Sequence, residues 1–170
     1  SLVMDRQLGQ ANATLHTLAT SQALVTGDFT EFDRQARAAV PSDGSWISLR
    51  DMSGRQLVNT RVPTGAPLPP PVPVIDAKAL AASPPPYVSN LIMNAPAGFP
   101  IVAIDYPVRR DGKMVYDLAM ALPVSSLQSV FADQKLPAAW AAAVIDRKGV
   151  IVARSHNPVT SVGHKVQPAF

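Results

Sequence analysis

The sequence contains one hairpin pattern twice, at a spacing of 95 residues. Residues 46–60 (WISLRDMSGRQLVNT) read as two short apolar strands around an Asp-x-x-Gly turn, and residues 141–155 (AAAVIDRKGVIVARS) repeat that pattern, with Asp51 falling on Asp146. Because an internal repeat marks an architectural unit, we predict two copies of a small sheet module. Only 20 residues follow Val150, too few for a second complete sheet, so we expect a piece of a longer protein.

Composition excludes several classes of function. The hydrophobic share of 47% is enough for a real core. The net charge is only +3 and no run of Lys or Arg exceeds two residues, so we expect no nucleic-acid partner. The absence of Cys rules out disulfides, a thiolate nucleophile and a cysteine-zinc site. No apolar run approaches the roughly 18–20 residues of a membrane helix. The helical pattern that starts at Ser1 is nevertheless expected of a segment just after a removed membrane anchor, so the absence of such a run is weak evidence against a membrane-bound parent.

The sequence offers little support for catalysis. The three histidines, His16, His156 and His164, lack the H-E-x-x-H or H-x-x-E-H spacing of zinc sites, so we expect them on the surface. Neither a G-x-S-x-G nucleophile elbow nor a glycine-rich phosphate loop occurs. We therefore predict no metal, no cofactor and no enzymatic activity in this chain. One alternative stays open: a small hydrolase that places His16 or His156 beside a carboxylate in a cleft.

The first 40 residues are predicted to be helical. Apolar positions recur at a 4-3-4-3-4-3 spacing, which is a heptad seam, and Gly27 is a plausible C′ residue for this long helix. Asp28 and Glu31 match an aspartate form of the capping box and start a shorter helix, which Pro41 stops. The long helix either packs on its own domain or forms a dimer seam, and both can hold along different parts of it. The seam residues are Met4, Leu8, Ala11, Leu15, Leu18, Gln22 and Val25.

The rest of the chain predicts an antiparallel sheet. Asp111-Gly112 is a favoured two-residue hairpin turn and joins strands at 101–108 and 113–122. Antiparallel strands flanked by helices predict an α+β domain, and not a doubly wound parallel sheet. The other expected elements are a proline-rich loop (62–74), a short helix (75–82), an edge strand (87–92) and a helix from Pro123 to about Leu136.

Several segments carry a family resemblance. They are Gly27-Asp28-Phe29, LRDMSGRQLVNTRVPTGAPLP (49–69), YPVRRDG (106–112), and AAVIDRKGVIVARS (142–155) with Val162-Gly163. Together they resemble bacterial double-Cache domains, which are PAS-like and extracytoplasmic, and in particular those ahead of membrane-bound sensor histidine kinases. The resemblance implies a long N-terminal helix, a membrane-distal sheet module with a pocket, and a membrane-proximal module. The motif of the amino-acid-binding members is not matched, so an amino-acid ligand is not predicted.

The resemblance also implies a domain division and a function. We expect the ligand-sensing, periplasmic part of a two-component histidine kinase of the inner membrane, with a small molecule such as an organic acid as its partner. It implies a homodimer through the N-terminal helix. The same sensor ahead of a diguanylate cyclase or chemoreceptor is an alternative, and so is a ligand-free structural dimerisation module. The expected divisions are 1–40 (long and short helix), 41–123 (membrane-distal PAS-like module), 124–139 (connecting helix) and 140–170 (start of an incomplete, smaller membrane-proximal PAS-like module).

Candidate binding residues are the polar and aromatic ones on predicted strands. A small-molecule pocket is mostly apolar with a few polar groups, and about half the residues of a strand point away from the core. Asp105 therefore lies either on an exposed face or in a pocket. Arg50 either clamps a ligand carboxylate or is solvated beside Asp51. Tyr106 and Tyr116 alternate with apolar neighbours, so they are either pocket residues or plain core aromatics. The predicted ligand-binding set is Trp46, Ser48, Arg50, Tyr87, Asp105, Tyr106 and Tyr116, and Asp117 is a further polar strand residue.

Overall fold

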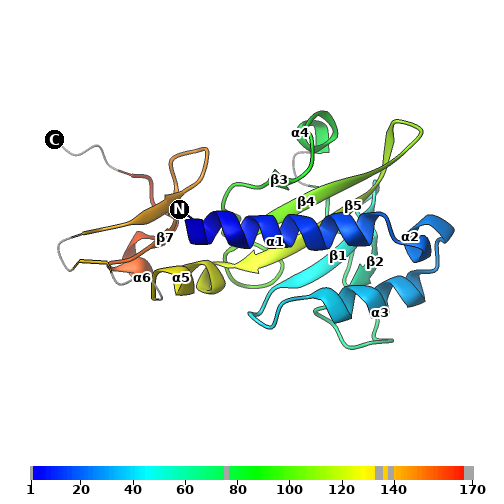
Figure 1. Cartoon of the computed structure of the whole chain (residues 1–170), viewed down its shortest axis with the longest axis horizontal. Coiled ribbons are helices and arrows are strands. Elements are labelled where there is room, and N and C mark those ends of the chain that lie inside the picture. Colours follow the sequence, from blue (N-terminus) through cyan, green and yellow to red (C-terminus); the bar gives the residue numbers. More distant parts are fainter. Residues whose placement is uncertain (1, 75–76, 133–135, 138–139, 167–170) are drawn as a thin grey trace.

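A computed structural model describes residues 2–74, 77–132, 136–137 and 140–166. Figure 1 shows an elongated molecule in which a long helix runs beside a five-stranded sheet, and a two-stranded unit lies at one end. The predicted α+β class, with helices flanking an antiparallel sheet, is confirmed. None of the helices in the described part of the chain is both long and apolar enough to cross a membrane.

The predicted long N-terminal helix is divided in two. Helix α1 (Leu2–Ala19) ends before Ser21, and α2 (Gln22–Thr26) follows. The Ser21 hydroxyl accepts a hydrogen bond from the backbone N–H of Leu24 at 3.2 Å, which is the N-cap contact that starts a new helix. The prediction of one continuous helix up to Gly27 is therefore wrong. Gly27 itself ends α2 with φ +75, as predicted.

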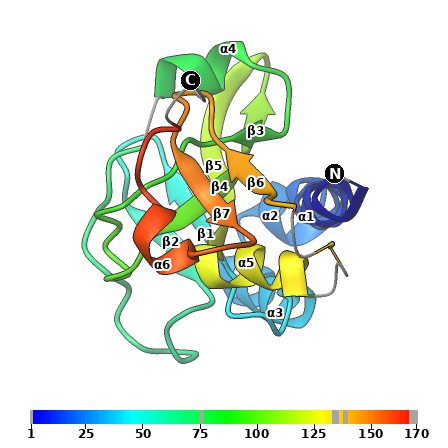
Figure 2. The same ribbon diagram turned by 90° about the vertical axis from the view of Figure 1, so that its left-hand side faces the viewer.

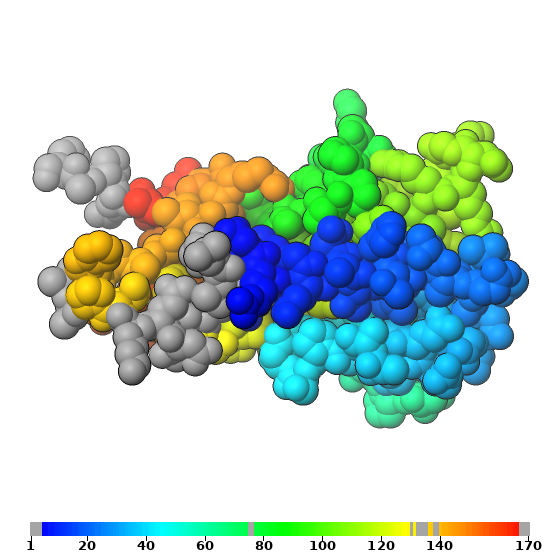
Figure 3. All heavy atoms as spheres, in the orientation of Figure 1, coloured from blue at the N-terminus to red at the C-terminus, as the bar shows by residue number. Residues whose placement is uncertain are grey.

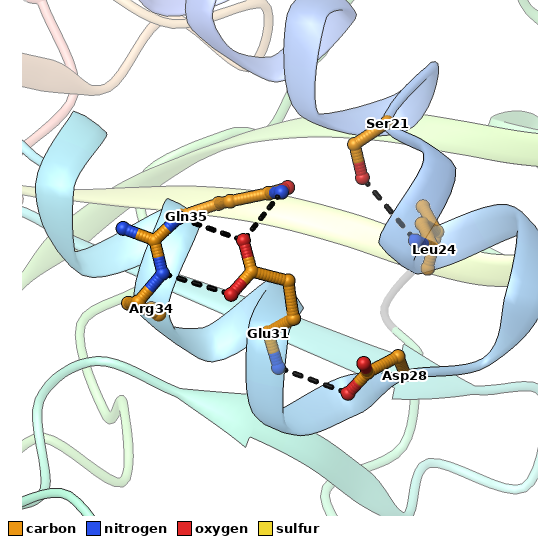
Figure 4. Close-up of polar contacts among 6 residues, drawn as sticks. All are labelled: Ser21, Leu24, Asp28, Glu31, Arg34 and Gln35. Carbon is orange, nitrogen blue, oxygen red and sulfur yellow. Dashed lines mark hydrogen bonds and ion pairs between the residues drawn. The ribbon is translucent and has the colours of Figure 1, made fainter.

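Helix α3 (Phe29–Ala39) begins at the predicted aspartate cap (Figure 4). Asp28 accepts a hydrogen bond from the backbone N–H of Glu31 at 3.1 Å. The Glu31 carboxylate does not complete the capping box, because it binds Arg34 at 2.7 Å and Gln35 at 3.0 Å instead. These contacts stabilise the first two turns from within the helix.

The heptad seam of α1 faces the protein's own sheet. Ala11, Leu15 and Leu18 are buried in the hydrophobic core, whereas Gln22 is exposed and Val25 is 56% exposed. Packing on its own domain is therefore the correct interpretation for the middle of this helix. A partner chain could not use these three buried side chains.

Five strands form one antiparallel sheet in the order β2-β1-β5-β4-β3. The β4–β5 hairpin turns at Asp111 and Gly112, with φ values of 50 and 75, which is the predicted type I′ geometry. The predicted edge strand is shorter than expected, although Ile92 still forms a bridge with Ile101. The strands are β1 (Trp46–Asp51), β2 (Gln56–Asn59), β3 (Tyr87–Val88), β4 (Ile101–Arg110) and β5 (Lys113–Pro123), and the short helix α4 (Ala77–Ala82) precedes β3.

Helices α1 and α3 cover one face of this sheet. The two helices lie side by side in the space-filling view (Figure 3). Large apolar side chains of the strands point into this interface, among them Ile47, Leu49, Ile104, Leu118 and Met120. The proline-rich residues 61–74 form no helix or strand. Residues 62–68 lie beside α3 at the β2 edge, and Pro69 and Val72 reach the opposite side of the sheet (Figure 2). The sheet therefore has a helix face and a loop-covered face.

The second hairpin follows helix α5 and ends in a short helix. Its strands are β6 (Ala143–Ile145) and β7 (Ile151–Arg154), which Figure 2 shows beside α5 (Val124–Ala132) and α6 (Pro158–Ser161). Trp140, predicted to start this hairpin, lies before it and is 66% exposed.

The two hairpins have equivalent hydrogen bonds at equivalent positions. Asp51 Oδ1 accepts the backbone N–H groups two and four residues later at 2.9 and 3.1 Å, and Asp146 Oδ1 does so at 2.8 and 3.0 Å. At the hairpin ends, the hydroxyl of Thr60 accepts a strand N–H at 3.0 Å, and that of Ser155 does so at 2.9 Å. The 95-residue repeat is therefore confirmed at the level of single atoms.

Candidate ligand-binding site

The loop-covered face of the sheet has a floor of small side chains. Along β4 and β5, large residues point to the helix face, while Ala103, Ala119 and Ala121 point the other way beside Ser48 of β1. Because a strand alternates its side chains between two faces, the same strands can fill a core on one side and leave space on the other. The space is a cavity of about 350 Å³, within the range of small-molecule sites.

Two loop segments form the walls of this cavity. The proline-rich segment contributes Val62, Pro69 and Val72, and residues 89–97 form the opposite wall. Arg61 connects the two walls at the mouth, because its guanidinium donates to the backbone carbonyl of Ala97 at 3.0 Å. The same guanidinium lies 5.1 Å from the ring centroid of Trp46 and 5.3 Å from that of Phe99. A cation therefore lies against two aromatic rings, which contact each other edge to face, at the entrance.

Strand β2 adds two buried amides to the cavity. The register between β1 and β2 shifts after Leu49, so that Gln56 and not Leu57 lies opposite Arg50. This β-bulge turns the Gln56 amide to the cavity side. The Asn59 amide donates to Gln56 Oε1 at 2.7 Å, and Gln56 in turn donates to the Pro70 carbonyl at 3.2 Å. The amides therefore hold the proline-rich wall against the sheet.

A cluster of three charged side chains forms the inner end of the cavity. Arg50 of β1 lies opposite Asp117 of β5 in the strand register, and Asp105 of β4 lies opposite Ala119, two residues along β5 from Asp117 and on the same face. The Arg50 guanidinium is in direct contact with Asp117 and is 3.6 Å from Asp105. The side chains of Arg50 and Asp105 are only 11% and 8% exposed, and that of Asp117 is fully buried. One guanidinium thus faces two buried carboxyl groups.

The environment of this cluster shifts both carboxyl groups in the same direction. Burial, and then the neighbouring Asp117 carboxylate, raise the pKa of Asp105 well above its usual range, and Arg50 opposes this only in part. Burial also raises the pKa of Asp117, although its contact with Arg50 offsets part of the effect. Two atoms of the cluster, Arg50 Nε and Asp117 Oδ1, are buried without a hydrogen-bond partner among the described residues. With one guanidinium and two carboxyl groups, the cluster has more acidic than basic groups.

The structure brings four of the seven predicted residues to this cavity. Trp46, Ser48, Arg50 and Asp105 line it. Asp105 thus occupies the pocket position, and Arg50 is paired with aspartates and not solvated. Tyr87 lies opposite Asp105 in the register, on the same face of the sheet, but outside the cavity lining. Its ring stacks under the guanidinium of Arg147, at 4.9 Å.

For Tyr106 and Tyr116 the structure corrects the prediction. Both lie on the helix face, on the other side of the sheet from the cavity. The Tyr106 hydroxyl is 2.7 Å from His16 Nδ1 of α1, and the Tyr116 ring packs edge-on against Phe29 of α3. Their alternation with Ile104, Val108 and other core residues already placed them on that face, since residues two apart share a side.

Five polar residues of the site were missed or left out of the predicted set. They are Gln56, Asn59, Arg61, Ser89 and Asp117. A usable signal was present for Asp117, because it alternates with Leu118 and Met120 and shares a face with Ala119 and Ala121. Gln56 carried no such signal, because its direction depends on the bulge.

The structure removes the hydrolase alternative. His16, His156 and His164 are all exposed. The hydrogen-bond partner of His16 is Tyr106, and that of His156 is Ser155, so neither imidazole has a carboxylate partner among the described residues. Within the described part of the chain, no group of three His, Asp or Glu side chains converges in a way that could hold a metal ion.

The fold is shared with bacterial sensor domains of known structure. The ligand-binding domain of the Pseudomonas aeruginosa amino-acid chemoreceptor PctC, solved with GABA, has a TM-score of 0.68 and 18% identity over 95% of this chain and 71% of its own. The corresponding domain of the Campylobacter jejuni chemoreceptor Tlp3, solved with 4-methylisoleucine, has a TM-score of 0.70 and 15% identity over 98% of this chain and 68% of its own. The sensor domain of the V. cholerae histidine kinase DctB has a TM-score of 0.65 and 12% identity, over 98% and 66%.

These similarities concern the fold and not a shared family sequence. No protein-family model matches the sequence, and no curated protein matches it significantly. The resemblance to double-Cache sensor domains that the sequence motifs indicated is confirmed at the level of fold. The chain spans about two thirds of the length of these solved domains.

Proposed function

We propose that this chain is the small-molecule sensing part of a bacterial transmembrane signalling protein, and that it acts by binding and not by catalysis. The observation that carries the proposal is the cavity, with its alanine floor and its charged inner end. A purely structural module would fill this face of the sheet with its own side chains. The shared fold with chemoreceptor and histidine kinase sensor domains supports the same function.

The charges of the site favour a ligand that carries an ammonium group. Arg50 already contacts Asp117 and Asp105, so it is not free to clamp a ligand carboxylate. Asp105 lines the cavity, and a cation placed there would balance the second carboxylate. A simple organic acid, as first expected, lacks this cation. Arg61 at the mouth offers a partner for a carboxylate at the other end of the ligand, so an amino acid or a similar zwitterion fits best.

Matched pairs of compounds test this proposal. We would measure the thermal stability of the Trp140→Phe variant and its Trp46 fluorescence with GABA and butyrate, and with L-isoleucine and 3-methylpentanoate. A ligand at 100 times its Kd adds about 2.7 kcal/mol, which raises the Tm of a domain of this size by several degrees. We expect this with an amine and not with the matched acid. Equal or stronger binding of the acids would contradict the ammonium preference, and no binding by any compound would favour a ligand-free module.

The domain division and the location belong to the same proposal. The sheet of residues 41–123 is the membrane-distal module, residues 124–139 connect it, and residues 140–170 begin the membrane-proximal module. The whole would lie in the periplasm. A histidine kinase is the first candidate for the parent protein, and a chemoreceptor or a diguanylate cyclase is the alternative. Solved domains of this fold belong to a histidine kinase and to chemoreceptors. A phosphotransfer assay on the full-length parent would distinguish them.

A homodimer in the parent would use the exposed side of α1. The buried seam residues are unavailable, whereas Gly9, Ala13 and Thr17 are exposed on the opposite side. We expect Ala13→Cys to form a disulfide between two copies of the full-length receptor in membranes. Ala38→Cys, on the exposed side of α3, is the matched control. Cross-linking of the control alone would contradict this dimer.

A further inference from the structure

The inner end of the cavity has one more acid than base. Asp105 and Asp117 are 6% and 0% exposed, and the single guanidinium of Arg50 serves both. Two ionised carboxylates and one cation in a buried site would leave an uncompensated negative charge, which is costly away from water. The ligand-free domain can avoid this charge by keeping one proton on the pair.

Within the described part of the chain, the surroundings of the pair offer no second cation to balance it. Toward the cavity, β1 contributes Arg50, and β2 contributes the neutral amides of Gln56 and Asn59. From β3, Tyr87 lies opposite Asp105 and is stacked with Arg147, whose guanidinium donates to the Val88 carbonyl. Asp51 follows Arg50 in β1, so it points to the other side of the sheet, where it pairs with Arg55. Arg61 is held at the mouth by Ala97.

From this geometry we propose that Asp105 and Asp117 hold one shared proton in the ligand-free domain, and that the ammonium group of the ligand replaces it, so that binding releases a proton. The proposal rests on the proposed sensing function and adds its regulation by pH. Asp117 stays ionised against Arg50, with which it is in direct contact. Asp105 is the group that changes state, because it faces the cavity.

The exchange conserves charge and atoms. Before binding, Arg50 is positive, Asp117 negative and Asp105 neutral, so the cluster has no net charge. The ligand ammonium then donates hydrogen bonds to an ionised Asp105, whose carboxylic proton leaves to solvent. The cluster and the ligand ammonium together again carry no net charge. At pH values below the pKa of Asp105, the apparent affinity for the ligand then rises tenfold for each unit of pH, because one proton is released for each ligand bound.

The direction of the pKa shifts agrees with this assignment. The pKa of Asp105 is raised well above its usual range by burial and by the Asp117 carboxylate, whereas direct contact with Arg50 offsets part of the rise that burial causes for Asp117. A raised pKa in the folded state means that the folded protein binds more protons than the unfolded chain. The contribution of Asp105 to stability is therefore largest at acidic pH and is lost as the pH rises through its folded pKa.

Carboxyl NMR of the ligand-free domain tests the first half of the proposal. We would follow the ¹³C signals of labelled aspartate carboxyl groups against pH and assign the pair with Asp105→Asn and Asp117→Asn. One signal of the pair should titrate well above the others. Titration of every aspartate near the ordinary value of about 3.9 would overturn the shared proton, whether or not a ligand binds.

Calorimetry tests the exchange itself. The heat of binding of GABA and of L-isoleucine would be measured in buffers with different ionisation enthalpies, and the dependence on buffer should correspond to nearly one proton released. Asp105→Asn should abolish the release. Asp111→Asn is the matched control, because Asp111 lies at the tip of the β4–β5 hairpin, where Asn tolerates its positive φ.

The outcomes separate this inference from the proposed function. Binding of an amine without proton release, or with an affinity independent of pH, would leave the sensing function intact and overturn the exchange. A raised carboxyl titration with no binding of any amine would overturn the exchange together with the ammonium ligand. A raised titration, binding and release of about one proton would support both.

Discussion

The two hairpins of the repeat have the same local structure and different neighbours. Both turn on an aspartate and a left-handed glycine, and both shift register at the equivalent point, after Leu49 in the first and after Val144 in the second. The first hairpin belongs to a five-stranded sheet and carries Arg50 into the cavity. The second is a sheet of two strands. Local sequence therefore determines the turn, and the surrounding structure determines what the turn is used for.

The equivalent aspartates show this difference most clearly. Asp51 Oδ2 pairs with Arg55 of its own hairpin at 3.1 Å. Asp146 Oδ2 instead accepts the backbone N–H of Leu91 at 3.0 Å, within the segment that forms one wall of the cavity. The next residue, Arg147, donates to the Val88 carbonyl at 2.6 Å. The second hairpin thus holds the cavity wall through Asp146, whereas the equivalent Asp51 makes contacts only within its own hairpin.

The largest difference in stability between the two hairpins should appear when the turn glycines are replaced. Gly54 has φ +85, and a Cβ there would lie 2.5 Å from the Val72 carbonyl oxygen, whereas Gly149 has φ +75 and open space around it. We expect Gly54→Ala to lower the free energy of unfolding by about 4 kcal/mol, from backbone strain and overpacking together. Gly149→Ala should cost about 1 kcal/mol from strain alone. Urea denaturation measures both, and equal losses would contradict the comparison.

The apolar partners beneath the hairpins should differ next. Leu49 is fully buried, whereas its counterpart Val144 is only partly buried against the core. We expect Leu49→Ala to cost about 3 kcal/mol and Val144→Ala about 1 kcal/mol. The same denaturation experiment, followed by circular dichroism, provides the measurement. A larger loss for Val144→Ala would mean that the second hairpin supports the core more than its burial indicates.

The hydroxyl groups at the hairpin ends should behave alike. The Thr60 hydroxyl accepts the Ile47 N–H at 3.0 Å and the Ser155 hydroxyl accepts the Ala142 N–H at 2.9 Å, while the further contact of Ser155 with His156 is to an exposed imidazole. Thr60→Val and Ser155→Ala should therefore each cost about 1 kcal/mol, the usual net value of one hydrogen bond. Thr64→Val, at an exposed position in the proline-rich segment, is a suitable control. A difference of more than twofold between the two variants would break the equivalence of the repeat.

The smallest change in stability should come from lowering the pH, which protonates the two turn aspartates. Hydrogen bonds, first from Ser53, lower the pKa of Asp51. Burial opposes ionisation of Asp146, but the backbone N–H groups of Val150, Leu91 and Lys148 outweigh it and lower its pKa. Both groups therefore contribute stability above about pH 4 that is lost as the pH falls through their folded pKa values. Amide exchange at Leu91 should accelerate in Asp146→Asn and not in Asp51→Asn, because only Asp146 accepts that N–H.

Much of the fold follows from pattern, and the parts that do not have physical reasons. The period of two in β4 and β5 and the Asp111-Gly112 turn predict the central hairpin, because each signal is local. The break at Ser21 was missed because a heptad pattern records which side chains are apolar and does not record a competing cap. The partners of Arg50 could not be predicted, since Asp105 and Asp117 lie 55 and 67 residues away and meet only through strand register.

The alanine floor has a consequence for how such a sensor can change over evolution. Ala103, Ala119 and Ala121 touch the cavity, while their neighbours along the same strands fill the core on the other side. A mutation that adds a methyl or two to the floor would reshape the ligand that fits without disturbing the packing beneath the helices. Residues that determine ligand preference therefore alternate along β4 and β5 with residues that stabilise the core, and the two sets can change independently. A lineage of such receptors could diversify its chemistry by single substitutions while it keeps one scaffold.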